Sequence, residues 1–202
     1  IDLSPSWGME VYGANPVAKR QIDNRSEMYQ FIGSVYAEYR IIEGLKIRGD
    51  INIANFQSKG SSFSPGFIQE DWSALGGTPY PSSRDVTRSD VSNTSINFRA
   101  DYNLDIKDHR LSFMVGYGWD RTFSTSEYAG YQDFADDEVL NNIGSAASAV
   151  YYGDGKSVNG LNSVYARIGY IYSDRYLAEV NFRSDASSKF GPGNKRGYFP
   201  SL

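Results

Sequence analysis

Few residues of this chain are of types that could carry out catalysis or hold a metal ion. The chain contains a single histidine, His109, and no cysteine. Neither a histidine-based catalytic triad nor a multi-histidine or thiolate metal site can therefore be built from it. The acidic cluster Asp133, Asp136, Asp137 and Glu138 could bind Ca²⁺, but its spacing matches no EF-hand loop and we interpret it as a solvated loop. We expect no catalytic residue, no metal site and no cofactor.

The stretch Gly155-Lys156-Ser157 resembles the end of a phosphate-binding loop. That motif requires a glycine five residues before its second glycine, and Val150 occupies this position. No strand-to-helix context surrounds the stretch either. We therefore reject a nucleotide-phosphate site.

Aromatic side chains are the best candidates for contact with a ligand, because sugar rings stack on Trp and Tyr and these side chains combine a large apolar area with a polar tip. They lie in two stretches without regular alternation, 58–92 and 124–160, and they are Trp72, Tyr80, Tyr128, Tyr131, Tyr151 and Tyr152. The alternative is that they pack within their own loops or meet a partner protein.

The stretch 95–123 shows how the chain must be organised to present these loops. Every second residue from Ile96 to Ile106 is apolar, and every intervening residue is polar or charged. A turn at 107–110 follows, and the alternation resumes from Leu111 to Trp119. Side chains of a strand alternate between two faces, so this pattern predicts a hairpin with one apolar face and one polar face. Each limb is about ten residues long, the length that a tilted strand needs to cross a bilayer.

Two further pairs of alternating segments predict the same hairpin design. They are 29–41 and 45–53 about a turn at 43–44, and 164–172 and 176–182 about a turn at 173–175. Long connections at 58–92 and 124–160 and a medium one at 186–197 separate the hairpins, and 1–26 reads as loop with a short strand near 9–12. Short turns that alternate with long loops are typical of bacterial outer-membrane barrels, whereas compact soluble domains seldom hold two such loops.

The charges and aromatic residues of these segments agree with a barrel wall. In the central part of each strand nearly every charged residue falls on the non-apolar face, as lipid exposure requires, and Arg121 is an exception near a strand end. Tyrosines near the short turns and aromatic residues near the long loops are placed like two aromatic girdles. We predict an all-β fold, an antiparallel transmembrane β-barrel segment of six strands with a seventh beginning. So few strands cannot close a lumen in lipid, so the segment would be part of a larger barrel.

Composition sets further limits. Mean hydropathy is −0.48 and no run approaches 18 apolar residues, which excludes a transmembrane helix but not a membrane barrel. A net charge of −4 and a pI near 5.0 argue against nucleic acid as a partner. The amino terminus lacks the features of a signal peptide and the chain stops where a strand begins, so we expect a fragment.

The last twenty residues carry a specific motif. Residues 183–202 closely resemble the signature of SusC/RagA-type TonB-dependent outer-membrane transporters. The matching positions are Arg183, Asp185, Ser187, Ser188, Lys189, Phe190, Gly191, Asn194, Gly197, Phe199, Pro200 and Ser201. Lys189 stands where arginine is more usual. The stretch 15–18 and the segment 45–48 after the Glu-Gly turn are also similar to the middle of the family's barrel.

This resemblance implies a barrel of about 22 strands that holds an N-terminal plug. It also implies a SusD-like surface lipoprotein as a lid, TonB as the source of energy, and import of oligosaccharides or peptides across the outer membrane, mostly in Bacteroidota. Residues 1–202 would all belong to the barrel domain, and the plug, the TonB box and the C-terminal closing strands would lie outside them. The protein would be a multi-pass outer-membrane transporter in contact with lipid, and not an enzyme.

We interpret the signature residues as structural. Gly191, Pro192, Gly193 and Gly197 suit a tight extracellular turn, and Arg183 and Asp185 could pair on the lumen face. The same interpretation extends to Phe190, Phe199 and Pro200. The alternative is direct contact with substrate or plug.

A rival function also fits the alternation. A non-transport binding module, such as a carbohydrate-binding sandwich or an outer-membrane adhesin, would share the β-rich pattern. Apolar stripes of two stacked layers meeting in a dry centre would favour the sandwich. A hydrolase is disfavoured because no pair of carboxylates is placed recognisably on neighbouring strands.

Overall fold

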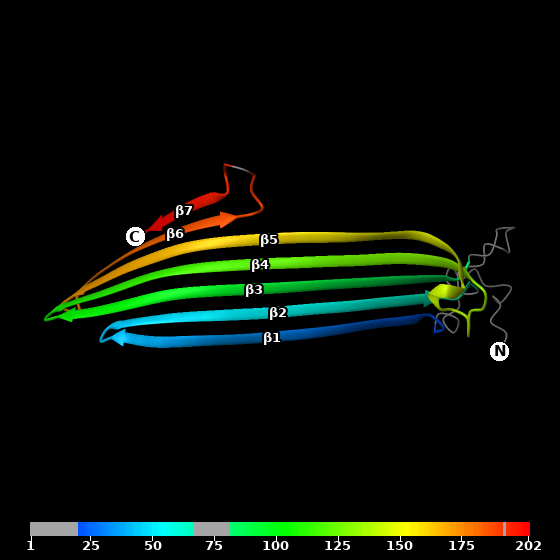
Figure 1. Cartoon of the computed structure of the whole chain (residues 1–202), viewed down its shortest axis with the longest axis horizontal. Helices are drawn as coiled ribbons and strands as arrows, with labels where there is room; N and C mark the ends of the chain where they lie inside the picture. The colour runs from blue at the N-terminus through cyan, green and yellow to red at the C-terminus, as the bar shows by residue number, and fades with distance from the viewer. Residues whose placement is uncertain (1–19, 67–80, 192) are drawn as a thin grey trace, which may run out of the picture. The chain divides into compact units, whose positions relative to one another are not determined.

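The computed structural model describes residues 20–66, 81–191 and 193–202. Seven strands form one sheet in chain order, β1 to β7, and consecutive strands lie side by side (Figure 1). They are β1 (Asp23–Ile42), β2 (Leu45–Ser64), β3 (Ser83–Ile106), β4 (His109–Phe134), β5 (Ala146–Tyr172), β6 (Tyr176–Ser187) and β7 (Arg196–Ser201), with a 3₁₀ turn at Ile143–Ser145. The predicted all-β fold of six strands with a seventh is confirmed. No helix in the described ranges is long and apolar enough to cross a membrane.

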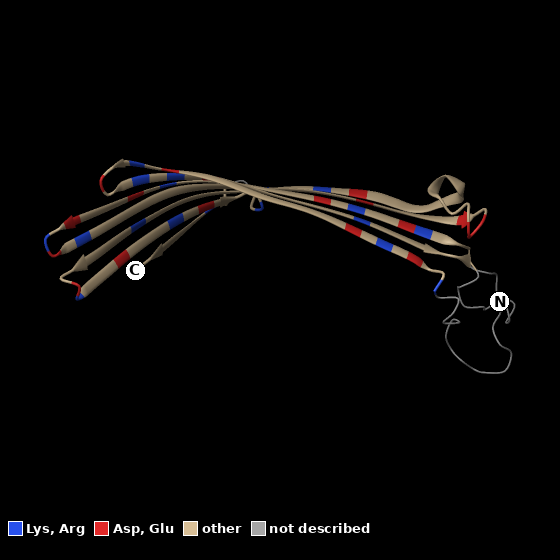
Figure 2. Cartoon of the chain, turned by 90° about the horizontal axis from the view of Figure 1, so that it is seen from below, with Lys and Arg blue, Asp and Glu red and all other residues tan. Residues whose placement is uncertain are grey.

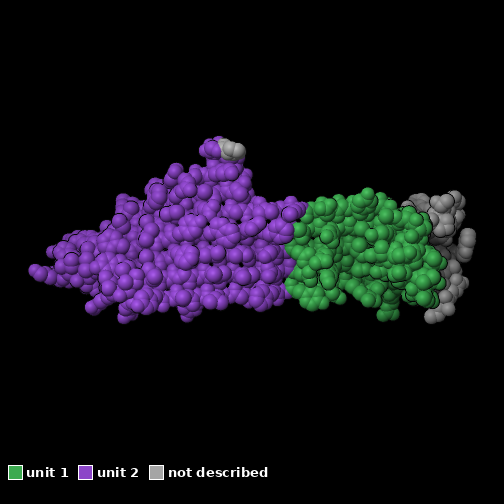
Figure 3. Space-filling model, in the orientation of Figure 1, with its two compact units in different colours: residues 1–29, 57–90, 125–155 green, residues 30–56, 91–124, 156–202 purple. Residues whose placement is uncertain are grey.

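The chain divides into two compact units (Figure 3). Unit 1 comprises 1–29, 57–90 and 125–155, and unit 2 comprises 30–56, 91–124 and 156–202. Each unit contains parts of several strands. We describe the two units separately.

Unit 2 has the alternation that the sequence predicts. In the antiparallel pair β5–β6, Ala166 lies opposite Phe182 and Ile168 lies opposite Val180. Apolar residues thus meet apolar residues across the strands. The rings of Tyr102 and Phe113 stack in the same way between β3 and β4, with centroids 6.4 Å apart. This register produces one continuous apolar face, as period-two alternation requires.

The three predicted short turns are present. Gly44, Lys107, Ser173 and Asp174 have positive φ at these turns, which suits the tight reversal of a hairpin. Charged residues lie in or beside all three turns, and Figure 2 marks them together with the charges along the strands. Positive φ is easiest for glycine, and a short polar side chain such as Asp174 tolerates it.

β1 to β5 contain 20 to 27 residues and are longer than the sequence predicts, so this part of the prediction is wrong. β3, β4 and β5 contain 24, 26 and 27 residues. The stretches expected as loops at 58–64, 83–92, 124–134 and 146–160 are therefore strand, and β1 begins at Asp23 rather than at Tyr29. In these stretches both faces are rich in small or polar residues, so the apolar alternation that identifies a strand is missing although the backbone ladder continues.

Apolar burial is confined to one small contact in unit 1. Among the described residues only Phe63 and Phe134 are buried apolar residues, and their rings meet edge to face at 5.4 Å. Asp133 precedes this contact with φ 58°, and the backbone N–H of Asp133 donates to the carbonyl of Ser82. All described strands belong to one sheet, so their apolar stripes do not pack against a second described layer.

Candidate functional site

The polar face of unit 2 carries a chain of side-chain hydrogen bonds across β1, β2 and β3. The Ser34 hydroxyl donates to Asn52 Oδ1 at 2.6 Å, and the Asn52 amide donates to Asp50 Oδ2 at 2.8 Å. The amide of Asn97 donates to the same carboxylate oxygen at 2.8 Å. Polar groups that satisfy one another across strands keep this face hydrophilic and ordered.

Aromatic exceptions on this face have identifiable partners. Tyr165 of β5 lies on this polar face, and its ring lies directly over Gly116 of β4. The Arg48 guanidinium lies over the Tyr36 ring of β1, with Arg48 Cζ 4.3 Å from the ring centroid. A glycine makes room for one ring and a cation covers the other, so both are accommodated.

Arg183 and Asp185 pair on this face, as the sequence predicts. Arg183 Nε donates to both carboxylate oxygens of Asp185 at 2.9 and 2.8 Å, and Nη2 donates to Ser163 Oγ at 3.1 Å. Ser163 is only 2% exposed. The pair thus links two neighbours on β6 to a buried hydroxyl on β5, an arrangement consistent with a structural role.

The signature turn is held by backbone contacts. The Ser188 N–H donates to the carbonyl of Gly160, and the Gly160 N–H donates to Ser188 Oγ at 2.7 Å. Gly193 has φ 91°, and the Asn194 N–H donates to the carbonyl of Gly191. These contacts agree with the predicted tight turn, whereas Pro192 lies outside the described residues.

Gly197 does not belong to that turn, and the prediction is wrong for this residue. It lies in β7 opposite Asp185, and a Cβ added to it would be 2.8 Å from the Phe199 ring. Phe199 pairs with Arg183 and Pro200 pairs with Phe182, so both are strand residues. Phe190 is 59% exposed in the connection before β7.

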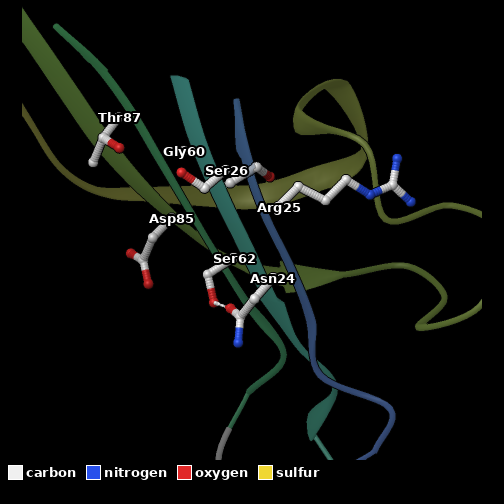
Figure 4. Close-up of a pocket in the computed structure, with 8 residues that line it drawn as sticks. Asn24, Arg25, Ser26, Gly60, Ser62, Asp85 and Thr87 are labelled. Atoms are coloured by element: carbon white, nitrogen blue, oxygen red, sulfur yellow. Dashed lines mark hydrogen bonds between the residues drawn. The ribbon is translucent and has the colours of Figure 1, made fainter. Parts of the chain in front are cut away.

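One face of unit 1 is built mainly of small uncharged side chains, and we call it the serine–glycine face. Its members include Ser26, Gly60, Ser62, Thr87, Gly130 and Gly153. The Ser62 hydroxyl donates to Asn24 Oδ1 at 2.5 Å, and Gly60 lies against the Thr87 hydroxyl. A shallow pocket of about 270 Å³ lies here (Figure 4). Its lining residues are Asn24, Arg25, Ser26, Gly60, Ser61, Ser62, Asp85 and Thr87.

Tyrosines cover glycines beside this pocket. The Tyr151 ring of β5 lies over Gly130 of β4, and its hydroxyl donates a hydrogen bond to the Asp85 carboxylate of β3. The Tyr128 hydroxyl lies over Gly153, and the rings of Tyr128 and Tyr151 are 6.3 Å apart and tilted. The hydrogen bond to Asp85 raises the pKa of Tyr151, because it stabilises the protonated phenol.

The aromatic ligand candidates separate into three groups. Trp72 and Tyr80 lie outside the described residues. Tyr128 and Tyr151 lie on the serine–glycine face, whereas strand alternation places Tyr131 and Tyr152 on the opposite face. These last four belong to β4 and β5 and not to loops, which corrects their predicted setting. Tyr152 is 82% exposed.

The remaining polar candidates form hydrogen bonds with other residues of the chain. The Asp136 carboxylate accepts hydrogen bonds from the N–H groups of Glu138 and Val139 at 2.6 and 2.7 Å, which lowers the pKa of Asp136. Asp137 accepts one from the N–H of Gly66. His109 Nδ1 lies 2.7 Å from the Tyr170 hydroxyl, so this residue contacts an aromatic cluster as well as beginning β4. No group of three potential metal ligands occurs within the described residues.

Sequence reasoning missed the residues that define the pocket, above all Asp85. They lie in a stretch without apolar alternation that was expected to be loop, so no face could be assigned to them. One signal was present. The glycines at 130, 153 and 155 alternate with other residues near Tyr128 and Tyr151, as in strands where rings cover glycines on a neighbour.

Comparison with known proteins finds that the chain is similar to part of several TonB-dependent receptors. No protein-family model matches it. It is 26% identical over 198 residues to the TonB-dependent receptor P3 of Formosa agariphila, which covers 97% of this chain and 19% of that protein. It is 27% identical over 203 residues to the TonB-dependent receptor SusC of Bacteroides thetaiotaomicron, which covers 93% of this chain and 18% of that protein.

The fold is similar to part of a solved transporter. The structure of the RagAB peptide transporter superimposes with a TM-score of 0.82 at 18% identity, over 92% of this chain and 20% of that chain. The RagAB peptide importer in its open-open state gives a TM-score of 0.79 at 20% identity. The seven-stranded sheet thus matches part of the RagA barrel, and the chain spans about a fifth of the length of these relatives.

Proposed function

We propose that this chain, which spans about a fifth of the length of the relatives that it matches, is part of a SusC/RagA-type TonB-dependent receptor and forms barrel wall and surface-exposed strand ends of an outer-membrane importer. The family is one of transporters and not of enzymes. The cargo that we propose is an oligosaccharide or a peptide.

The apolar face of unit 2 is the observation that carries this proposal. Its side chains are large and exposed, for example Val35 at 75%, Phe98 at 58% and Val115 at 53%. A sheet face of this extent is too apolar to be left in water. Hydrocarbon tails would cover it without a second protein layer, while all backbone groups inside the sheet remain paired.

The polar face of unit 2 would then face the interior of the barrel. The hydrogen-bonded chain through Asp50 and the Arg183–Asp185 pair suit a hydrated or plugged lumen. Arg or Lys in the middle of a lipid-facing surface would cost about 2–4 kcal/mol, which explains why these charges are kept on the other face. Unit 1 comprises the strand ends remote from the short turns, and we place it at the cell surface.

The partners follow from the same family. We propose that a SusD-like surface lipoprotein works with this receptor and that TonB energises it through parts of the receptor outside these 202 residues. The solved RagAB relative is a peptide transporter, and the name of the SusC relative states no substrate. The proposed cargo therefore remains an oligosaccharide or a peptide.

The full-length receptor provides the test. A protein that forms a membrane barrel should require detergent for extraction from outer membranes and should migrate faster on a denaturing gel unheated than boiled. Release of the receptor by alkaline carbonate without detergent, together with identical migration before and after boiling, would contradict the proposal. That outcome would favour the rival binding module.

A further inference from the structure

The two faces of unit 1 differ sharply in charge. By strand alternation, the charged strand residues of unit 1 on the face opposite the serine–glycine face are Asp23, Arg25, Glu27, Lys59, Arg84, Arg88, Asp90, Glu127, Asp133 and Asp154. Several bind one another, as in the Arg88–Asp90 pair at 2.8 Å. Among the described strand residues of this unit, alternation leaves Asp85 as the one charged residue on the serine–glycine face.

The pocket beside Asp85 offers hydroxyl and amide groups around that single carboxylate. Asn24, Ser62 and Thr87 supply neutral donors and acceptors. Arg25 is the one cationic residue in the lining, and its guanidinium extends away from the other labelled side chains (Figure 4). Asp23 binds that guanidinium at 2.9 Å, so Arg25 does not offset the charge of Asp85 inside the pocket.

Tyr151 fixes the carboxylate in place without neutralising it. Its hydroxyl donates to one oxygen, Oδ1, of Asp85, and within the described part of the chain no group donates to Oδ2, which can accept a further hydrogen bond. Its ring and that of Tyr128 add an apolar surface next to the pocket. A ligand here would meet hydroxyls, one acceptor carboxylate and two aromatic rings. Among the described lining residues, a second negative charge would meet only Arg25, whose guanidinium is already bound by Asp23.

We propose that this pocket is an anion-excluding subsite for an uncharged, hydroxyl-bearing segment of a ligand, such as a neutral sugar unit, with Asp85 as the residue that sets its charge preference. Asp85 accepts hydrogen bonds from ligand hydroxyls and repels carboxylate or sulfate groups. The inference rests on the proposed function for its biological meaning, because the ligand would be the cargo. It deepens that function by selecting neutral sugars over acidic sugars and acidic peptides.

The local charge of the subsite can be measured without knowing the cargo. A cysteine placed by Thr87→Cys in an otherwise cysteine-free full-length receptor reports on the pocket. Its rate of modification is compared for three methanethiosulfonate reagents, carrying a neutral hydroxyethyl, a cationic trimethylammonium and an anionic sulfonate group. Reactivity with a simple thiol in solution corrects for the intrinsic differences between reagents.

We expect the anionic reagent to react about five-fold more slowly than the neutral one, after this correction, because of the carboxylate of Asp85. Asp85→Asn should remove most of this difference, since the amide keeps an acceptor for Tyr151 but no charge. Asp154→Asn, on the opposite face, is the matched control and should leave the difference unchanged. Equal corrected rates in the parent, an unaltered difference in the Asp85→Asn variant, or failure of all three reagents to react would each overturn the proposal.

This result is separable from the proposed function. A receptor that shows the charge preference but is released from membranes without detergent would support the subsite and contradict the proposed importer. A receptor that behaves as a membrane barrel but is modified at equal corrected rates by the three reagents would support the importer and contradict the subsite. Solubility and labelling are measured on the same preparation.

Discussion

The Tyr151 hydroxyl donates a hydrogen bond to the Asp85 carboxylate across an intervening strand. Tyr151 lies on β5, Asp85 lies on β3, and Gly130 of β4 lies beneath the ring. Any side chain at Gly130 would occupy the space of that ring, so glycine is what permits one residue to connect three strands. The contact forms part of the serine–glycine face and borders its pocket.

A methyl group at Gly130 should therefore destabilise unit 1 through Tyr151. We expect Gly130→Ala to lower the free energy of unfolding by about 1–3 kcal/mol, because the ring must move and its hydrogen bond is lost. In a Tyr151→Ala background the same substitution should cost little, so the two changes should be strongly coupled. Urea unfolding of the full-length receptor in detergent micelles measures both values.

Gly191 supplies the matched control for that experiment. A Cβ there would meet no atom within 4 Å, and Gly191→Ala should change stability by less than about 0.5 kcal/mol. Equal changes in the free energy of unfolding for the Gly130→Ala and Gly191→Ala variants would contradict the packing of the Tyr151 ring over Gly130.

Adjacent residues of β4 should respond oppositely to a charge. Val115 lies on the apolar face and Met114 on the polar face of the same strand. Val115→Arg should cost about 2–4 kcal/mol in folding into a bilayer, whereas Met114→Arg should cost much less. Folding of both variants into lipid vesicles, followed by heat-dependent gel mobility, gives the comparison. Equal losses of folding free energy in the two variants would contradict a lipid-facing position of Val115.

The connection between β4 and β5 should loosen in acid because of Asp136. Hydrogen bonds from the backbone N–H groups of Val139 and Glu138 lower the pKa of Asp136 in the folded chain. A lowered folded pKa means that the stabilisation is present above the ordinary aspartate value of 3.8 and is lost as pH falls through the lower folded value.

Hydrogen exchange of the peptide 135–142 tests this directly. After correction for intrinsic rates, Asp136→Ala should increase exchange at neutral pH, and the parent should approach the variant once the pH falls below the folded pKa. A parent whose protection is unchanged from neutral pH to pH 2 would contradict a role for the Asp136 carboxylate.

The apolar half of the fold was predictable from the sequence because apolar and polar residues alternate strictly along its strands. The hairpins about Gly44, Lys107 and Asp174 and the order of seven strands follow from that alternation and from turn chemistry. The polar halves of β3, β4 and β5 were not predictable, because small residues such as Ser126 and Gly153 occupy strands and loops alike. Their strand structure depends on register with neighbours, which no local pattern reveals.

The candidate site was predictable only in part for the same reason. Tyr128 and Tyr151 were identified as ligand candidates from residue type alone, but their position on one face with Asp85 depends on strand pairing. Arg183 and Asp185 are two residues apart in a strand, so their pairing could be inferred locally. Asp85 and Tyr151 are 66 residues apart, and only the sheet brings them together.

Spin labels at two adjacent residues of β5 test the central claim most directly. Ala166 pairs with Phe182 on the apolar face, and Arg167 pairs with Asn181 on the polar face. In the full-length receptor reconstituted in lipid vesicles, a label at Ala166→Cys should be relaxed mainly by dissolved oxygen, which partitions into hydrocarbon. A label at Arg167→Cys should be relaxed mainly by a water-soluble nickel complex. The same preference at both positions, or the reverse assignment, would contradict a barrel wall with lipid on one side and a watery or plugged interior on the other.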